Sequence, residues 1–364
     1  MDHHSQRRQK LLETLHQEEL DALLLSSPFN VTYLTGFTGE ASYLIIGRQR
    51  TLLVSDFRFT VQLAEECPDL DVHIRPPSQP LALAVGEVLG KLGFRSVGFE
   101  SGHLTVAEWE TLREQTPGID WKPGRDRVEQ LRAVKDEAEI TEIRQAIAIA
   151  ERAFTAFRAL LRPSDSEKDL ADALEMYVRR CGGSGTAFPP IVAAGERAAL
   201  PHAPPTARRV EEAELLLVDW GATGRLYKSD LTRTLATRRI SPKLEEVYTV
   251  VLNAQQQALQ CIRPGVRACD VDAAARRVIA EAGYGEFFGH GLGHGFGLQI
   301  HEAPFLRPGN EAVLQAGMVL TIEPGIYLPE WGGVRIEDDV LVTPDGGAVL
   351  TSVARDLAGS VVEW

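Results

Sequence analysis

The chain has few cysteines, and their spacing is irregular. There are four, Cys67, Cys181, Cys261 and Cys269, among 364 residues, and no two of them form a C-x-x-C pair. A disulfide framework or a thiolate zinc site is therefore not expected. This use of cysteine favours a reducing compartment, and we expect the cytoplasm.

Positive charge and long apolar runs are also scarce. The chain has 38 Lys and Arg against 51 Asp and Glu, a formal net charge of -13. Phosphate recognition needs clustered Lys and Arg, so we expect no nucleic-acid partner. No uninterrupted apolar run approaches the ~20 residues that span a bilayer, so we expect no membrane partner. The N-terminal stretch "MDHHSQRRQK" is polar and has no apolar segment after it, which does not fit a signal peptide.

The length of the chain predicts two domains, because a single hydrophobic core rarely grows so large. Over residues 1–126, strand patterns such as "DALLLSS" alternate with helix patterns such as "LALAVGEVLGKLG". A hairpin is expected in "SYLIIGRQRTLLVSDF", with its turn at residues 47–50. This alternation indicates an α/β layer domain. The stretch "DWKPGRD", residues 120–126, is expected to be the linker to a second domain over residues 127–364.

The second domain shows signs of internal duplication. A long amphipathic helix is expected over residues 136–161. The two stretches "RPSDSEKDLADALEMYVRRCGG" and "IRPGVRACDVDAAARRVIAEAG" align at a constant offset of 101, which matches Asp169 with Asp270 and Gly182 with Gly283. Two such helix pairs indicate a duplicated α/β unit, although any two amphipathic helices look somewhat alike. A duplicated fold tends to place its working groups between its halves.

Two segments of the second domain place carboxylates in pairs. In "LLLVDWGATGRLYKSDLTRTLA", a turn centred between Gly224 and Arg225 would put Asp219 directly opposite Asp230, with Cβ atoms ~5 Å apart. In "MVLTIEPGIYLPEWGGVRIEDDVLV", Glu323 and Glu337 are equidistant from the intervening loop and can also face each other. Carboxylates this close cannot all ionise in a dry environment, so they need a cation, a shared proton or water.

The stretch "GHGLGHGFGLQIHE", residues 289–302, adds three of the nine histidines. Four carboxylates and an imidazole suit two divalent cations bridged by water, and the mostly oxygen ligand set favours Mn²⁺, with Co²⁺ or Zn²⁺ as alternatives. Other motifs do not fit: "HEAPF" is not H-E-x-x-H, and the chain has no G-x-G-x-x-G in this stretch, no P-loop and no G-x-S-x-G.

Taken together, these segments resemble the Xaa-Pro peptidases, prolidase and aminopeptidase P. The resemblance is carried by "VDWGA", "YKSDLTRT", "GLGHGFGLQIHE", "TIEPGIY" and "GGVRIED", and in the first domain by "NVTYLTGFTG" and "SDFRF". It implies an α/β (α+β) protein, with a creatinase-like N-terminal α/β domain followed by a duplicated pita-bread catalytic domain. It also implies a homodimer.

The resemblance assigns roles to particular residues. The implied ligands of the two metal ions are Asp219, Asp230, His294, Glu323 and Glu337. Glu323 is also expected to pass on the proton, while His202 and His301 stabilise the developing oxyanion. The residues expected to support the ligands or contact the substrate are His290, Arg335, Tyr227, Phe305, Arg307 and Trp331.

The implied reaction is hydrolysis of the bond between an N-terminal residue and proline, in short peptides with proline in second position. Strict dipeptidases of the family often carry a basic residue shortly after "IHE", where this chain has Phe305, with Arg307 two residues on. The sequence therefore slightly favours an aminopeptidase, and a strict dipeptidase remains the alternative. The remaining alternatives are a non-proline aminopeptidase with the same fold and a peptide-binding relative without activity.

Overall fold

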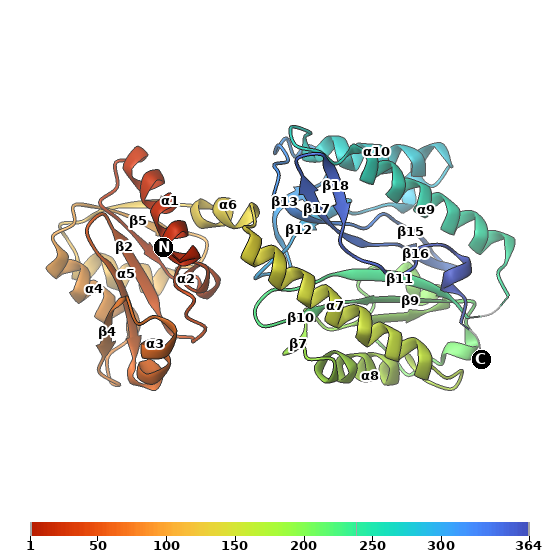
Figure 1. The fold of residues 1–364 in the computed structure, drawn as a ribbon, viewed down its shortest axis with the longest axis horizontal. Coiled ribbons are helices and arrows are strands. Elements are labelled where there is room, and N and C mark those ends of the chain that lie inside the picture. Colours follow the sequence, from red (N-terminus) through yellow and green to blue (C-terminus); the bar gives the residue numbers. More distant parts are fainter. Residues whose placement is uncertain (1, 238, 363–364) are drawn as a thin grey trace. The chain divides into compact units, whose positions relative to one another are not determined.

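The computed structural model describes residues 2–237 and 239–362. The chain divides into two compact units, one that ends at Arg132 and one that begins at Ala133 (Figure 1). None of the helices in the described residues combines the length and the apolar character that crossing a membrane requires.

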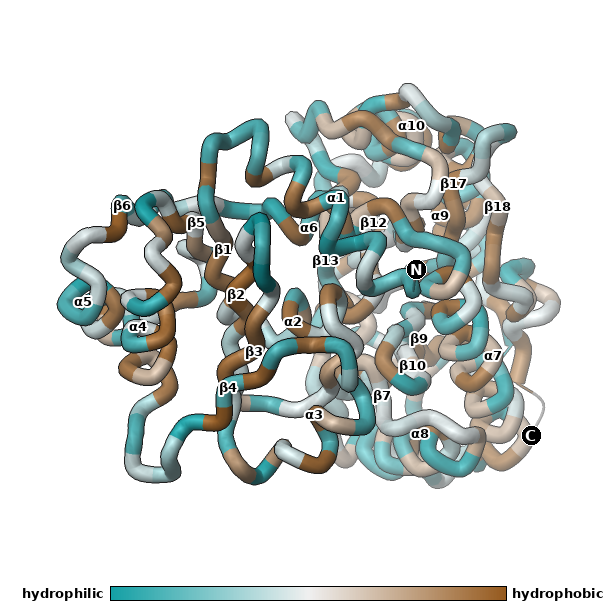
Figure 2. Tube along the Cα trace, turned by 60° about the vertical axis from the view of Figure 1, so that its left-hand side comes forward, coloured by the Kyte–Doolittle hydropathy of each residue, from teal (hydrophilic) through white to brown (hydrophobic). Residues whose placement is uncertain are grey.

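The first unit is a mixed sheet with helices packed on it. Its strands run in the order β4-β3-β2-β1-β5-β6, with β1 antiparallel to β2 and parallel to β5. Every residue of β1 and β2 is buried, and Figure 2 shows hydrophobic residues along both. The elements are α1 His3–Gln17, β1 Ala22–Leu25, α2 Pro28–Thr35, β2 Tyr43–Gly47, β3 Thr51–Asp56, α3 Thr60–Glu66, β4 Asp71–Arg75, α4 Leu81–Leu92, β5 Ser96–Glu100, α5 Val106–Gln115, β6 Asp120–Gly124 and α6 Arg127–Ala133.

The hairpin expected in this unit is confirmed, because the Gly47 N–H donates to the carbonyl oxygen of Arg50 between β2 and β3. The linker expected at residues 120–126 is wrong, because Asp120–Gly124 forms strand β6. Strand β6 pairs in parallel with β5 and lies at the edge of the sheet. Pro123 fits there because an edge strand does not need every backbone N–H. The chain passes to the second unit within α6 instead.

The second unit contains two pairs of long helices and several short sheets. In Figure 1 the strands lie between the pair α7 and α8 and the pair α9 and α10. The elements are α7 Glu137–Leu160, α8 Glu167–Arg180, β7 Gly185–Thr186, β8 Ile191–Ala194, β9 Leu215–Trp220, β10 Ala222–Thr223, β11 Leu231–Ala236, α9 Pro242–Cys261, α10 Ala268–Glu281, β12 Gly293–Gly295, β13 Glu302–Leu306, β14 Val319–Ile322, β15 Gly325–Leu328, β16 Gly332–Arg335, β17 Asp338–Thr343 and β18 Gly346–Val349.

The predicted repeat is confirmed in the helices. The starts of α8 and α10 differ by 268 − 167 = 101 residues, and their ends by 281 − 180 = 101. Alternate residues of β9 are buried on opposite sides: Leu216 and Val218 pack in the cluster that contains α7 and α8, and Leu215 and Leu217 in the cluster that contains α9 and α10. Because strand side chains alternate, Asp219 continues the second set and points between the two halves.

Candidate metal centre and active-site cavity

The first pair of carboxylates comes from strands β9 and β11, but not in the expected register. Asp219 is paired with Thr232, not with Asp230. The turn lies one residue further along the chain than expected, because the Gly224 N–H donates to the carbonyl oxygen of Tyr227 at 2.9 Å. This shift moves each cross-strand partner by two residues, and side chains two residues apart share a face. Asp219 and Asp230 are therefore diagonal neighbours on one face.

The second pair comes from the hairpin of β15 and β16. Its register pairs Gly325 with Arg335, and continuing the same register leads from Glu323 to Glu337, as the sequence predicts. Glu337 also bridges back to Thr232 of β11, whose hydroxyl donates to Glu337 Oε2 at 2.6 Å. The two hairpins thus meet, and carboxylate oxygens of Asp219, Asp230 and Glu337 lie within 4.8 Å of one another.

His294 is aimed at the same cluster from the short strand β12. Its Nε2 lies 3.4 Å from Glu323 Oε1 and 3.6 Å from Asp230 Oδ2. Its Nδ1 lies 3.0 Å from the carbonyl oxygen of Gly295; a carbonyl only accepts, so Nδ1 carries the proton and Nε2 presents its lone pair. Burial, and next the charge of His301, lowers the pKa of His294 to about 4, which keeps the ring neutral near pH 7.

The glycines beside His294 are required by packing. A side chain at Gly293 would overlap the carbonyl oxygen of Thr321, and one at Gly295 would overlap that of Ala303. Strand β12 lies between β13 and β14, so both flanks of His294 touch neighbouring backbone. The glycines of "GLGHGFG" therefore let the strand bring His294 close to the carboxylates.

The electrostatics of the cluster favour a bound cation. Burial, and next the repulsion of Glu337, Asp219 and Glu323, raises the pKa of Asp230 well above its usual range. Burial raises the pKa of Glu323 to about 8, and burial, followed by the charge of Glu323, raises the pKa of Glu337 well above its usual range. Arg335 offers one countercharge, with Nη2 at 2.5 Å from Asp219 Oδ2.

The donor atoms fit divalent metal ions. Asp219 Oδ1 is buried and has no hydrogen-bond partner among the described residues, so it can serve as a ligand. Four carboxylates and one neutral imidazole are the donor types that Mn²⁺, Co²⁺ and Zn²⁺ accept. A dication here would offset the repulsion that raises the carboxyl pKa values.

The cluster opens into a cavity of about 620 Å³. His202 and His301 line it and are exposed, and Phe305 and Arg307 line it as well. The other predicted residues that line it are Asp219, Asp230, His290, His294, Glu323, Arg335 and Glu337.

Two of the residues that the sequence placed near the ligands or the substrate do not line this cavity. The hydroxyl of Tyr227 is buried and donates to Glu139 Oε1 at 3.0 Å, in the first turn of α7. Trp331 is half-buried and packs on the core cluster that contains α9 and α10.

The structure also shows supporting residues that the sequence did not indicate. Tyr327 links two of the residues that the sequence did predict, Arg335 and His290. Its hydroxyl accepts from Arg335 Nη1 and lies 2.8 Å from His290 Nε2. Because the Nδ1 of His290 faces the carbonyl oxygen of Gly291, Nε2 is the acceptor and the Tyr327 hydroxyl donates to it. The motif "GIY" alone gives no sign of these partners.

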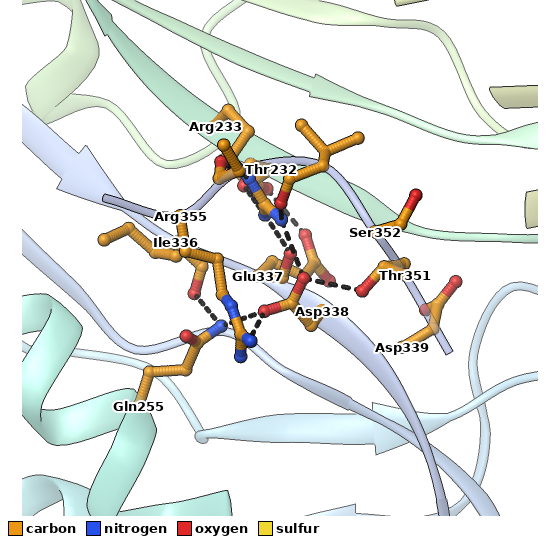
Figure 3. A network of polar contacts seen from close by, with 12 residues as sticks. Thr232, Arg233, Gln255, Ile336, Glu337, Asp338, Asp339, Thr351, Ser352 and Arg355 are labelled. Carbon is orange, nitrogen blue, oxygen red and sulfur yellow. Dashed lines mark hydrogen bonds and ion pairs between the residues drawn. The ribbon is translucent and has the colours of Figure 1, made fainter. Parts of the chain in front are cut away.

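A second network lies behind Glu337 (Figure 3). Arg233 pairs with Asp338 at 2.7 Å and also donates to the main-chain oxygen of Glu337. Gln255 and Thr351 donate to the same aspartate at 2.8 and 2.6 Å. Arg233 follows Thr232 on β11, so its side chain leaves on the face opposite to Asp219. That alternation is the signal from which a supporting role could have been inferred.

A buried cluster of carboxylates and imidazole, open to a cavity in a duplicated α/β unit, defines a metal-dependent hydrolase of the pita-bread class. The chain belongs to metallopeptidase family M24: the family profile matches residues 141–344, and that of the creatinase/prolidase N-terminal domain matches residues 7–134. The protein is a metallo-exopeptidase with a creatinase-like N-terminal domain, and the family depends on divalent metal ions.

Several relatives cover almost the whole chain. The Xaa-Pro dipeptidase of Pyrococcus horikoshii is 36% identical over 359 residues, 98% of this chain and 100% of that protein. The structure of an Xaa-Pro dipeptidase from Bacillus anthracis has a TM-score of 0.92 at 36% identity and covers 97% of this chain and 99% of that one. That of an X-Pro aminopeptidase from Thermotoga maritima has a TM-score of 0.90 at 36% identity and covers 98% and 100%.

Proposed function

We propose that the protein hydrolyses the bond between an N-terminal residue and proline in short peptides. The observation that carries the proposal is the cavity in which four carboxylates, His294, His202 and His301 converge. The names of the relatives, Xaa-Pro dipeptidase and X-Pro aminopeptidase, supply the substrate class. An X-Pro bond is a tertiary amide without an N–H, so enzymes that recognise that donor fail on it.

In this proposal two divalent ions, Mn²⁺ in the first instance and Co²⁺ or Zn²⁺ as alternatives, are bound by Asp219, Asp230, His294, Glu323 and Glu337. When bound, they acidify a water molecule and polarise the scissile carbonyl. Glu323 takes the proton of the attacking water and passes it to the proline nitrogen as the bond breaks.

The histidines stabilise the charge that develops on the substrate, and Arg335 orients a metal ligand. His202 and His301 donate hydrogen bonds from the cavity wall to the oxygen that becomes negative. Arg335 holds Asp219 by an ion pair and is itself fixed by Tyr327, so the ligand carboxylate stays in one orientation. The homodimer that the resemblance implies stays a prediction. Size-exclusion chromatography with light scattering, which measures the mass of the protein in solution, would test it.

Two observations favour different subtypes. Phe305 is exposed at the cavity, at a position where strict dipeptidases often carry a positive charge, and this favours longer peptides. Arg307 lines the same cavity, 5.6 Å from the centre of the Phe305 ring, and can bind the free carboxylate of a dipeptide. The dipeptidase activity therefore fits at least as well as the aminopeptidase activity.

The test is hydrolysis of Leu-Pro and Leu-Pro-Pro in parallel, by metal-stripped protein with Mn²⁺ restored. Glu323→Gln is the inactive reference, and Arg307→Met is compared with the exposed Arg263→Met. A dipeptidase would lose at least about 10-fold in kcat/KM on Leu-Pro alone when Arg307 is replaced, since a charge-assisted contact contributes about 1.5–3 kcal/mol. An aminopeptidase would favour Leu-Pro-Pro and tolerate the change. No hydrolysis of either peptide by protein that has taken up metal would overturn the proposal.

A further inference from the structure

A buried glutamate outside the cavity joins both ends of the loop that carries His202. Glu167 is the first residue of α8, and its side chain is 0% exposed. Its Oε1 accepts from the Ala194 N–H at 2.8 Å, just before the loop. Its Oε2 accepts from the N–H and the hydroxyl of Thr206, at 2.9 and 2.6 Å, just after it. We call residues 195–205 the His202 loop.

Arg197 strengthens this closure from within the His202 loop. Its Nε lies 2.9 Å from Glu167 Oε2, and its Nη2 donates to the carbonyl oxygen of Pro204 at 2.6 Å. The start and the end of the loop are thus joined twice, once through the carboxylate and once through the guanidinium. A carboxylate removed from water is costly unless it is paired and hydrogen-bonded, and Glu167 is both.

The second half of the duplicated unit shows that the helix does not require this glutamate. At the offset of 101 residues, α10 begins with Ala268 where α8 begins with Glu167. Both helix starts pair with a later segment in the same way: the Glu167 N–H donates to Arg208 O at 2.9 Å, and the Ala268 N–H to Ala312 O at 2.8 Å. Capping does not need Glu167 either, because Ser166 and Asp169 form the capping box of α8.

The His202 loop also contacts the metal centre's own supports. Arg335 Nη2 lies 3.4 Å from the carbonyl oxygen of Pro201, next to His202. A side chain at Gly333 on β16 would overlap the carbonyl oxygen of Ala198. Displacement of the loop would therefore change where His202 lies relative to Arg335 and Asp219.

We propose that Glu167, together with Arg197, is a positioning residue that holds the His202 imidazole at the wall of the active-site cavity. The inference rests on the proposed function, in which His202 donates to the developing oxyanion. Misplacement of a reacting group by about 1 Å can lower a rate by about 100-fold. Glu167 would act on the rate in this way without touching the metal ligands or the substrate.

The test is a double-mutant cycle between Glu167→Gln and His202→Asn on Mn²⁺-loaded protein, measured as kcat and KM on the better of the two peptides. Glutamine keeps the shape but offers one acceptor oxygen where Ala194 and Thr206 need two. We expect Glu167→Gln to lower kcat by about 10- to 100-fold, with KM changed less and metal content unchanged. In the His202→Asn background the same change should cost less than about 3-fold, because the group that it positions is gone.

Glu175→Gln is the matched control, because Glu175 lies on the same helix and pairs with Arg179 on the surface. It should leave kcat unchanged. Thr206→Ala removes one donor to Glu167 and should give a smaller loss in a folded protein. Amide hydrogen exchange across residues 195–206 should become faster in Glu167→Gln and stay unchanged in Glu175→Gln.

Three results would overturn the inference. The first is an equal loss from Glu167→Gln with and without His202, which would mean that the two residues act independently. The second is loss of bound metal from Glu167→Gln, which would mean that it acts through the metal centre. The third is full activity of His202→Asn alone. That result removes His202 from the proposed mechanism, and it is recognised before Glu167 is changed.

Discussion

Asp230 lies where the carboxylates of the candidate centre repel one another most. Glu337, Asp219, Glu323 and Asp339 all act to raise its pKa, on top of its burial. Replacing it with asparagine keeps the shape and removes one negative charge from the cluster. We therefore expect Asp230→Asn to be as stable as the parent, or more stable by roughly 1 kcal/mol, when both are free of metal.

Addition of Mn²⁺ should reverse this order. An ion that binds only the folded protein raises the melting temperature, and Asp230→Asn would bind it more weakly. Differential scanning calorimetry in EDTA and in Mn²⁺ measures the difference in melting temperature between the variant and the parent under each condition. Asp172→Asn, at an exposed position on α8, serves as control and should shift stability by less than about 0.5 kcal/mol in either condition. A metal-free Asp230→Asn that melts well below the parent would contradict this account of the site.

Tyr327 provides a test of the supporting contacts. Its hydroxyl receives a hydrogen bond from Arg335 and donates one to His290, each at 2.8 Å. Tyr327→Phe leaves a buried guanidinium N–H and a ring nitrogen without a partner, which costs about 1–3 kcal/mol of unfolding free energy. We also expect kcat/KM to fall by about 10-fold, because Arg335 is less firmly held against Asp219. Urea denaturation and steady-state kinetics measure the two effects.

Tyr248→Phe is the matched control for Tyr327. Its hydroxyl is also buried in the second unit, but it donates to the carbonyl oxygen of Arg355, which does not line the cavity, whereas the partners of Tyr327, His290 and Arg335, do. Stability should fall and kcat/KM should not. If both variants lose activity in proportion to stability, the Tyr327 contact has no separate role in the site.

At the residue scale, the sequence indicates the carboxylates and the histidine that converge in the structure, but only some of the residues that hold them, such as Arg335. Asp219 and Glu323 stand out because a charge that follows an apolar strand is unusual. Tyr327 is an ordinary strand residue, and its partner Arg335 comes from the neighbouring strand of the hairpin. The distances that join them depend on side-chain conformations, which no local pattern specifies.

The register of β9 and β11 shows why pairing is harder to predict than the strands themselves. Gly224 suggests the turn because glycine tolerates positive φ, yet neither Gly224 nor the turn residues Arg225 and Leu226 have positive φ. Gly224 instead lies against Ala146 of α7, at the end of the ladder. A side chain at Gly224 would make only ordinary contacts of 3.6 Å, so neither the backbone nor the packing requires a glycine here. A turn placed by this glycine is therefore one residue too early, although the carboxylates still share a face.

Strand β16 carries a glycine pair whose packing can be tested. A side chain at Gly333 would overlap the carbonyl oxygen of Ala198, which belongs to the His202 loop, and backbone cannot move aside as easily as a side chain. We expect Gly333→Ala to lower the unfolding free energy by about 1–3 kcal/mol, as overpacking does. Gly289→Ala is the control, since a side chain there meets no atom within 4 Å. Equal stability of the two variants in urea would show that the loop adapts at no cost.

At the scale of the whole molecule, the duplication is readable because helix length is preserved. The two helices begin and end at the same offset of 101 residues, and the glycines that follow them at that offset, Gly182 and Gly283, both have positive φ. The strands give no such signal, because β12 has only three residues and a register shift beside His294. Strand β12 depends on neighbours that are distant in sequence, so its pairing could not be predicted, in contrast to the hairpin of β15 and β16.

The division of the chain into two units makes a last prediction about metal binding. All five proposed ligands lie between Asp219 and Glu337, in the second unit. A metal at 100 times its dissociation constant stabilises the folded state by about 2.7 kcal/mol, which slows amide exchange by global opening roughly 100-fold. We expect Mn²⁺ to slow exchange in β9, β11, β14 and β17 relative to protein in EDTA, and to leave β1, β2 and β5 of the first unit unchanged. Asp230→Asn should respond less in the same strands. If Mn²⁺ slowed exchange equally in the strands of both units, the units would unfold together. Slower exchange in the strands of the first unit alone would place the metal elsewhere in the chain.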